Sequence, residues 1–568
     1  MTRTEEILET ADDIRVSMVT RHAPLPDGFP AHPADCDVLR HLRVKRVAAP
    51  DDPAAADVII ALLPGAIAGA RSLQPLGRNT VRNLAAAGLT AEVWVLDRRA
   101  NGVEDHSAIE IAMAEGDYHL AFDYYYGGKS VGGRVFGGFH RDRDLGFLAE
   151  FGSARTVEDT HEVLRREIPD ADLRAQKVIL GGHSLGAIQA GTYAAWDFAG
   201  RPGHEQIAAL VALDSITHLD PLRLSRRRAL AGPTGIAARA IERAPLLMRR
   251  GLAPNSTAVL KGGWGNAEAF ALIAAVAAAA TLAPEEESDI LRLLPRHGTP
   301  DLLVRGSTAR TWRELLTRTP DYRRLRLTNQ ALLGLLGGAH TSVNFAVLSM
   351  SCGTLDSAEV APRTFPLSFE AGQAPGVRTL YRAACGTAPR YSPTSFETLY
   401  RWRDYDRCGT GDAPAQFTRT GIPAVTADSE VVSLAELAPM LAGGRLNVFE
   451  DYFPIRQPLD AAAALGGCRT GSLAPLRHEQ GAARLPFINL MGRSSFTHAL
   501  TGLGVFPDQG VHWFPGYLHC DVAAGADPRA DGTPEPIAAT LAEFARTTVT
   551  STRRSSDVGG LDGALGLK

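Results

Sequence analysis

The sequence lacks a hydrophobic run long enough to cross a membrane. The most apolar stretch, residues 269–283, is short and consists mostly of alanine, whereas a membrane-spanning helix needs about 20 apolar residues. We therefore expect a buried or groove-lining helix there and no transmembrane segment. The N-terminus, MTRTEEILETADDIRV, also lacks the apolar stretch of a secretory signal, so we expect a cytoplasmic protein unless a leader precedes this sequence.

Cysteine is scarce, and charge of one sign does not accumulate. The six cysteines form no CxxC pair, which excludes a zinc knuckle and a dense disulfide scaffold. Cys385 and Cys408 flank a loop-like stretch and could pair in an oxidising compartment, with free buried thiols as the favoured alternative. The 59 basic residues nearly balance 63 acidic ones, for a formal charge of −4. Nucleic acid is therefore not an expected partner.

The composition is that of a folded protein of average polarity. Hydrophobic residues make up 45% and charged residues 21%, which excludes disordered, collagen-like and coiled-coil chains. The 568 residues exceed what one compact core needs, so the chain has either two domains or one fold with a large insertion.

Short apolar runs alternate with helical stretches at both ends of the chain, which predicts a parallel α/β sheet. After about residue 215 this alternation stops for about 270 residues, and we interpret the gap as one large insertion. Residues 101–152 are predicted to be an irregular surface loop. Strands are predicted at 57–65, 91–99, 177–181, 209–215, 485–491 and 511–515, and helices at 79–87, at 156–169 with a capping box of Thr156 and Asp159, and at 536–547.

The segment Gly182-His183-Ser184-Leu185-Gly186 matches the pattern GxSxG. It lies between a predicted buried strand and a helix of small residues, which is the context of a nucleophile elbow. The glycines suit a tight, strained turn that has no room for Cβ atoms beside the serine. At a helix N-terminus, Ser184 would expose its hydroxyl above the sheet; the alternative is an ordinary glycine turn.

On these features the sequence resembles the α/β-hydrolase superfamily, in particular its lipase and esterase branch with a large cap. The resemblance covers about residues 58–215 and 485–545. It implies a mostly parallel sheet flanked by helices, with a mainly helical cap inserted before the strand that precedes the catalytic histidine. The predicted units are a first core part at 1–215, a cap at 216–484, and a second core part at 485–568 with a disordered tail from about 550.

The family order of serine, acid, histidine directs the search for the base. The histidine has to follow the last strand, where it can take the serine proton and return it to the leaving group. His519 in Gly516-Tyr517-Leu518-His519-Cys520-Asp521 stands there, and the segment is similar to the aromatic-x-His-x-Asp signature of lipase-like members. His512 lies inside the predicted strand, and His498 and His340 have weaker context. Asp521 is read as a helix-start cap.

The acid departs from the common pattern, because the strand after the insertion leads into MGRSSFTHAL without a carboxylate. Some lipases carry the acid one strand earlier, and Asp214, at the end of ALVALD, occupies that position. A buried carboxylate there would orient the imidazole and stabilise its cation. The open alternatives are Asp508, Asp451 and Glu450, and Asp214 could instead be a helix N-cap.

Two backbone N–H groups are needed for an oxyanion hole, one after the nucleophile and one after an earlier strand. The resemblance assigns these roles to Leu185 and to Ala66 in LLPGAIAG, with Ile67 nearly as good. Nearby, Asp97-Arg98-Arg99, Asn101 and the Glu104-Asp105 pair follow the second strand. We interpret those charges as loop scaffolding.

The sequence therefore predicts a serine hydrolase that cleaves a carboxylic ester of a bulky, largely apolar substrate through an acyl-enzyme on Ser184. His519 acts as base and then acid, Asp214 orients it, and no metal or organic cofactor is implied. Apolar pieces of the insertion, residues 270–282 and 331–340, would line an acyl pocket or only bury the core of the insertion. Alternatives are an acyltransferase with the same triad and a non-catalytic ligand-binding protein on this fold.

Overall fold

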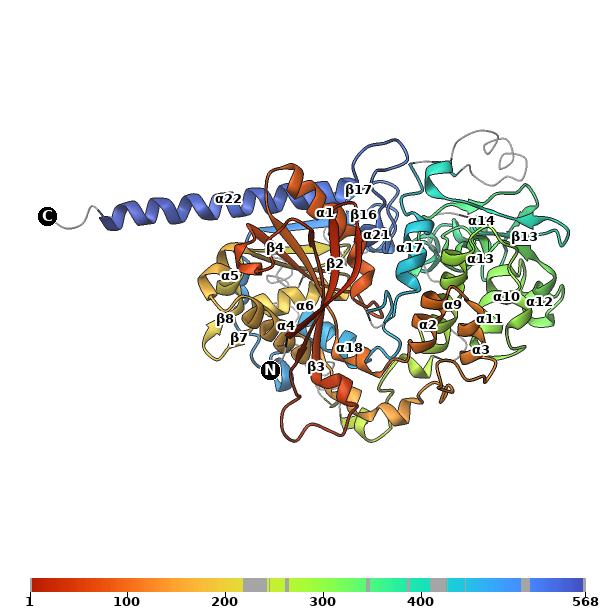
Figure 1. Ribbon diagram of the computed structural model, residues 1–568, viewed down its shortest axis with the longest axis horizontal. Coiled ribbons are helices and arrows are strands. Elements are labelled where there is room, and N and C mark those ends of the chain that lie inside the picture. Colours follow the sequence, from red (N-terminus) through yellow and green to blue (C-terminus); the bar gives the residue numbers. More distant parts are fainter. Residues whose placement is uncertain are drawn as a thin grey trace.

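A nine-stranded sheet forms the centre of the computed structural model (Figure 1). The structure describes residues 3–217, 243–244, 246–260, 265–343, 348–385, 389–408, 425–426, 428–444, 446–501 and 511–564. The strands of this sheet are β1 (Arg3–Ala11), β2 (Ile14–His22), β3 (Val38–Arg46), β4 (Val58–Leu63), β5 (Ala91–Leu96), β6 (Val178–His183), β9 (Ala209–Leu213), β16 (Phe487–Gly492) and β17 (His512–Phe514). The helices that bear on the site are α1 (Gln74–Ala86), α2 (Ser107–Glu115), α3 (His119–Tyr125), α4 (Ser153–Glu167), α6 (Leu185–Ala194), α9 (Ala267–Leu282), α11 (Gly298–Thr308), α13 (Asn329–Gly337), α17 (Leu434–Leu441), α18 (Arg456–Leu465), α19 (Glu479–Ala482), α20 (Phe496–Thr501), α21 (Asp521–Ala524) and α22 (Pro536–Ala564).

The strand order is β1-β2-β3-β5-β4-β6-β9-β16-β17. From β5 to β17 all neighbours are parallel, and β1, β2 and β3 extend the sheet in antiparallel fashion. This arrangement confirms the predicted mostly parallel α/β sheet flanked by helices. It also puts the carboxyl ends of β6, β9 and β17 along one edge, where ligands of open α/β sheets bind.

The parallel strands are buried on both faces, which explains their continuous apolar sequences. In β4, Ile60 and Leu62 pack into one apolar cluster with residues of α1 and α22, while Ile59 and Leu63 pack into another with residues of α4 and α6. Each helix layer therefore covers one face of the sheet. The helix α22 extends past residue 550, where we predicted a disordered tail.

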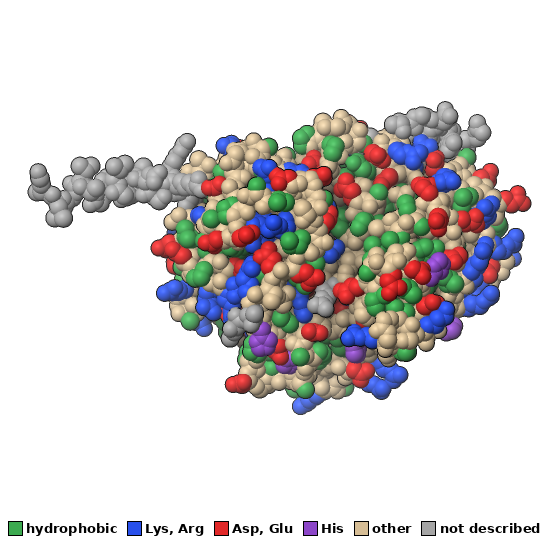
Figure 2. All heavy atoms as spheres, viewed as in Figure 1, with side chains coloured by type: hydrophobic (Ala, Val, Ile, Leu, Met, Phe, Trp, Pro, Cys, Tyr) green, Lys and Arg blue, Asp and Glu red, His purple; other side chains and the backbone are tan. Residues whose placement is uncertain are grey.

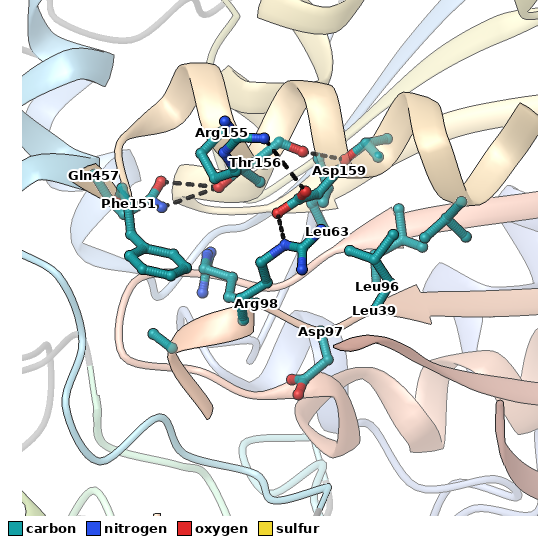
Figure 3. A pocket seen from close by; sticks show the side chains of 14 residues that line it. Leu39, Leu63, Leu96, Asp97, Arg98, Phe151, Arg155, Thr156, Asp159 and Gln457 are labelled. Carbon is teal, nitrogen blue, oxygen red and sulfur yellow. Dashed lines mark hydrogen bonds and ion pairs between the residues drawn. The ribbon is translucent and has the colours of Figure 1, made fainter. Parts of the chain in front are cut away.

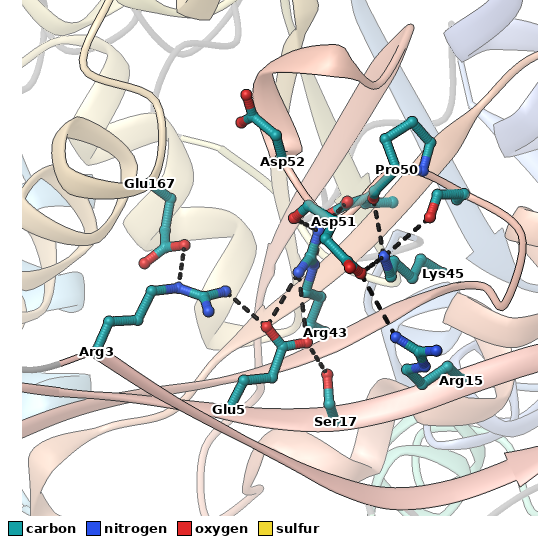
Figure 4. Close-up of polar contacts among 12 residues, drawn as sticks. Arg3, Glu5, Arg15, Ser17, Arg43, Lys45, Pro50, Asp51, Asp52 and Glu167 are labelled. Carbon is teal, nitrogen blue, oxygen red and sulfur yellow. Dashed lines mark hydrogen bonds and ion pairs between the residues drawn. The ribbon is translucent and has the colours of Figure 1, made fainter.

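The first three strands have no counterpart in the sequence prediction, and one of them, β3, buries charged side chains. Arg43 and Lys45 of β3 are each 1% exposed. Arg43 donates to Glu92 over 2.8 Å and to Glu5 over 3.1 Å, and Lys45 donates to Asp51 over 2.7 Å (Figure 4). Polar residues alternate with apolar ones here because ion pairs, not hydrocarbon, fill one side of β3.

Two local predictions between β5 and β6 were wrong. Residues 101–152 contain the helices α2 and α3 rather than one irregular loop. The helix α4 begins at Ser153, three residues before the predicted capping box, and Gly152 at its N-cap provides no side-chain cap. Thr156 instead exchanges hydrogen bonds with Gln457, and Asp159 accepts one from Arg99 (Figure 3).

The long connection between β9 and β16 contains helices, short strands of two or three residues and irregular segments, and it forms much of the right side of Figure 1. Its centre is α9, whose residues 269–280 are all buried and which packs against α11, α13 and α17. Before the chain enters β16, the connection already packs against helices that cover the sheet: α18 contacts α4 and α6, and α19 contacts α6. The division into units at residues 215 and 484 stays a prediction.

The remaining sequence predictions concern membrane-spanning helices, disulfides and the distribution of charge. Among the described residues no helix is long and apolar enough to span a bilayer. None of the six cysteines, all of which lie among the described residues, forms a disulfide. Figure 2 shows both signs of charge interspersed over the visible face.

Arg43 offers a test of the charged layer. Arg43→Ala leaves the buried carboxylate of Glu92 without its guanidinium, so the free energy of unfolding should fall by about 3–5 kcal/mol. Urea unfolding followed by circular dichroism measures it. Arg46→Ala, on the same strand but in an exposed pair with Asp13, should cost less than about 1 kcal/mol. An equal fall in the free energy of unfolding in both variants would show that the buried ion pairs of Arg43 stabilise the fold no more than an exposed pair does.

Candidate active site

Ser184 occupies the turn between β6 and α6. Its backbone has φ 53° and ψ −118°, a region that non-glycine residues rarely adopt and that marks strained turns at functional sites. A Cβ on Gly182 would collide with the backbone of Gly186, and a Cβ on Gly186 would collide with the carbonyl oxygen of Leu63. Both glycines are therefore required by close backbone approach, as GxSxG predicts.

Asp214 and His519 meet although 305 residues separate them. Nδ1 of His519 lies 2.5 Å from Oδ2 of Asp214, and the two side chains are 3% and 0% exposed. A hydrogen bond at this distance between a carboxylate and an imidazole is of the strong, charge-assisted kind. It fixes the orientation of the ring and leaves Nε2 as the nitrogen available for proton transfer.

The Asp214 carboxylate has three further donors, which come from the last residue of β16 and the segment that follows it. The Gly492 N–H and the Thr497 hydroxyl donate to Oδ1 over 2.9 Å each, and the Ser495 hydroxyl donates to Oδ2 over 2.5 Å. These bonds offset the cost of burying a charged group. Thus the stretch MGRSSFTHAL contains no carboxylate of its own, but it supplies the hydrogen-bond donors of Asp214.

His183 is a second imidazole beside His519. Its Nε2–H donates to the His519 carbonyl oxygen over 2.9 Å, and the two rings lie 4.4 Å apart. Burial lowers the pKa of His183 to about 3, so this ring stays neutral at physiological pH. It holds the backbone of His519 without adding charge next to it.

The loop after β4 carries the predicted oxyanion donors. Among the described residues, the N–H groups of Ala66, Ile67 and Leu185 have no acceptor within the protein. A Cβ on Gly65 would lie 3.0 Å from Nδ1 of His183, so the loop passes close to the elbow. Ala66 and Ile67 stay open alternatives.

Arg98 fixes this loop from behind. Its guanidinium donates to the carbonyl oxygens of Pro64 over 2.6 Å and Gly65 over 3.0 Å. It also donates to Ala68 O over 3.2 Å and to the Glu450 carboxylate over 2.8 Å. Arg98 therefore acts as scaffolding for one segment in particular, the backbone of the candidate oxyanion loop.

Ser184 and His519 line the same cavity, of about 190 Å³. Its walls are almost entirely apolar. They come from the loop after β4, from α17 and α21, and from short segments of the insertion, and include Ala66, Ile67, Leu348, Met350, Leu437, Leu441, Val448, Phe449, Ala523 and Ala524. The sequence prediction missed these wall residues: neither 270–282 nor 331–340 contributes, and α9 buries the core of the insertion instead.

The rival residues lie elsewhere. His340 pairs with Glu430 over 3.1 Å; His512 is exposed, and the His498 ring packs against Trp513. Asp521 accepts backbone N–H bonds from Leu518 and Ser351.

Of the rival acids, Glu450 accepts a hydrogen bond from Arg98, and the Asp451 N–H donates to Glu104. Asp508 lies outside the described residues. Among the described candidates, only Asp214 contacts His519.

Comparisons with known proteins give weak similarities. No family model and no curated protein matches the sequence. Solved structures that match include a lipase in an open form, 12% identical over 93% of this chain and 99% of that one, with a TM-score of 0.31. A laboratory-evolved variant of potato epoxide hydrolase is 12% identical over 96% and 100%, with a TM-score of 0.28. A peroxisomal α/β-hydrolase of Saccharomyces cerevisiae is 13% identical over 36% of this chain and 46% of its own, with a TM-score of 0.22. Similarities this low do not bear on the activity.

The neutral His183 makes stability depend on pH. Its pKa is about 3 in the folded chain and about 6.5 when unfolded, so below pH 6.5 only the unfolded chain takes up the proton. Stability is therefore lost as the pH falls from 6.5 toward 3.

His183→Gln should remove about 2 kcal/mol of the stability lost between pH 7 and pH 5, measured by urea unfolding at both values. The exposed His22→Gln variant should retain the wild-type loss. The same loss in His183→Gln would contradict a neutral, buried His183.

Proposed function

We propose that this chain is a serine hydrolase that cleaves a carboxylic ester of a largely apolar acyl group. The observation that carries the proposal is the buried 2.5 Å contact between Asp214 and His519, next to a serine held in a strained turn on the wall of the same cavity. A buried acid, an imidazole oriented by it and a serine hydroxyl on the cavity wall are the parts of a Ser-His-Asp triad.

In the proposed reaction, Nε2 of His519 takes the proton of the Ser184 hydroxyl while Oγ attacks the ester carbonyl carbon. The N–H groups of Leu185 and of Ala66 or Ile67 stabilise the oxyanion. His519 then gives its proton to the departing alkoxide, which leaves as the alcohol with the acyl group on Ser184. Water then attacks the carbonyl carbon of the acyl-enzyme while Nε2 of His519 takes a proton from it. The bond between the acyl carbon and Oγ breaks, His519 returns the proton to Oγ, and the carboxylic acid and free Ser184 result.

Asp214 orients His519 and stabilises the imidazolium that forms in both halves of the reaction. Its carboxylate accepts four hydrogen bonds, and its side chain is 0% exposed. An interaction shielded from water in this way is stronger than one at the surface.

Covalent labelling tests the nucleophile and the base. A fluorophosphonate probe should add one mass increment to the wild-type chain in intact-mass analysis and none to Ser184→Ala. His519→Ala should lose both labelling and p-nitrophenyl ester turnover, whereas the rival variant His512→Ala should retain both. Asp214→Asn should lower kcat by about 10³–10⁴-fold with little change in folding. A folded wild-type chain that resists the probe would instead support the ligand-binding alternative.

The same turnover assay separates hydrolysis from acyl transfer. With an alcohol or amine added in competition with water, a hydrolase yields mainly the free acid. Predominant transfer to the added nucleophile would assign the chain to the acyltransferase alternative instead.

The cavity wall predicts the acyl preference. Leu437→Trp on α17 fills part of the cavity, so kcat/KM for long-chain esters should fall about 10-fold or more while acetate esters are little affected. Leu316→Trp, at a site that is 73% exposed, is the matched control and should preserve the chain-length profile. An unchanged profile in Leu437→Trp would show that the acyl group binds outside this cavity.

A further inference from the structure

A second cluster of reactive side chains lies apart from the triad. Glu104 and His106 follow β5, and Asp451 comes from the far end of the insertion. One ligand atom from each of the three side chains can be chosen so that all three atoms lie within 4.8 Å of one another. This is the single such group of histidine, cysteine or acidic side chains among the described residues. The triad does not use it.

The three residues are built into the fold rather than gathered on its surface. The side chains of Glu104 and His106 are 1% and 7% exposed, and Asp451 is 5% exposed. Oε1 of Glu104 accepts the Asp451 N–H over 2.5 Å, and Oε2 lies 2.7 Å from Nε2 of His106. Backbone and side chains thus hold the two segments in a fixed relation.

The Asp451 carboxylate has an oxygen that no described group of the protein satisfies. Its Oδ1 is buried without any hydrogen-bond partner, although a buried carboxylate oxygen normally has one. Among the described residues neither Glu104 nor Asp451 forms an ion pair with lysine or arginine. Two adjacent buried carboxyls and one imidazole therefore lack a compensating cation.

We propose that Glu104, His106 and Asp451 form a binding site for a divalent cation of the zinc type. Calcium and magnesium prefer oxygen ligands alone, whereas an imidazole with two carboxylates suits zinc and related first-row metals. A tetrahedral zinc ion holds its ligand atoms about 3.4 Å apart, which fits inside the 4.8 Å spread of the cluster. Binding would replace the hydrogen bond between His106 and Glu104 and occupy the orphaned oxygen of Asp451.

A cavity gives the ion access. It has a volume of about 560 Å³ and is lined by His106 and Asp451 together with the rings of Tyr125, Phe136 and Tyr452. Three protein ligands beside an open space leave the fourth coordination position for water or another small ligand. The loop that carries Glu104 and His106 is itself held in place, because the Tyr125 hydroxyl donates to the Asp105 carbonyl oxygen over 2.7 Å.

A zinc titration of the full chain tests the proposal. After chelator treatment and dialysis, zinc chloride should bind at about one ion per chain in a calorimetric titration, and bound cobalt should show d–d absorption bands. Zinc should raise the thermal unfolding temperature. Calcium and magnesium should compete weakly. No zinc binding by the folded wild-type chain would overturn the proposal and leave a carboxyl–imidazole hydrogen-bond cluster.

Variants localise the site. Asp451→Asn and His106→Gln should weaken zinc binding by more than about 100-fold, because even the loss of an outer-sphere partner typically costs 10–100-fold. The matched control is His119→Gln, since His119 also contacts two carboxylates, Asp117 and Asp289, but at the surface. It should bind zinc as the wild type does. Stoichiometric binding in both folded cluster variants would place the metal elsewhere and refute the assignment.

Discussion

The contact between Asp214 and His519 constrains the whole architecture. The two residues are 305 positions apart, and each follows a different parallel strand, so they meet only if β9, β16 and β17 lie side by side in register. The sheet provides this register, with Leu213 paired to Leu490 and Leu490 paired to His512. Whatever the insertion does, it has to begin after β9 and return at β16 without disturbing these pairings.

Burial of this contact explains the polar residues around it. A carboxylate taken out of water needs hydrogen bonds in return, and Gly492, Ser495 and Thr497 provide them. The sequence after β16 departs from the usual pattern because it lacks an acid. In the structure the end of β16 and the segment after it provide hydrogen-bond donors to Asp214, which follows the neighbouring strand β9.

The parallel part of the sheet and the elbow could be predicted from the sequence because one physical cause dominates each. Burial on both faces makes strands such as Val58–Leu63 continuously apolar, and close backbone approach requires the glycines beside Ser184. The antiparallel strand β3 could not be recognised, because one of its buried faces carries Arg43 and Lys45, whose charges are paired with Glu92 and Asp51. Alternation of charge and hydrocarbon in β3 looks like an exposed strand or a loop until those partners are placed.

The cavity walls and the support of the oxyanion loop depend on contacts that no local pattern reveals. Residues 447–450, from the end of the insertion, lie along the loop after β4: Gly69 N–H donates to Val448 O, Arg71 N–H to Asn447 O, and Glu450 N–H to Ile67 O. Arg98 ties the same two segments together through Glu450 and the carbonyl oxygens of Pro64 and Gly65.

Residues 447–450 of the connection between β9 and β16 therefore form part of the frame that holds the candidate oxyanion donors. Asp451 continues this segment, and its N–H donates to Glu104. The Glu104–His106–Asp451 cluster thus adjoins Glu450, whose N–H donates to Ile67 O in the candidate oxyanion loop. The loop after β5 thus stabilises the candidate site from two sides, through Arg98 directly and through Glu104 by way of Asp451.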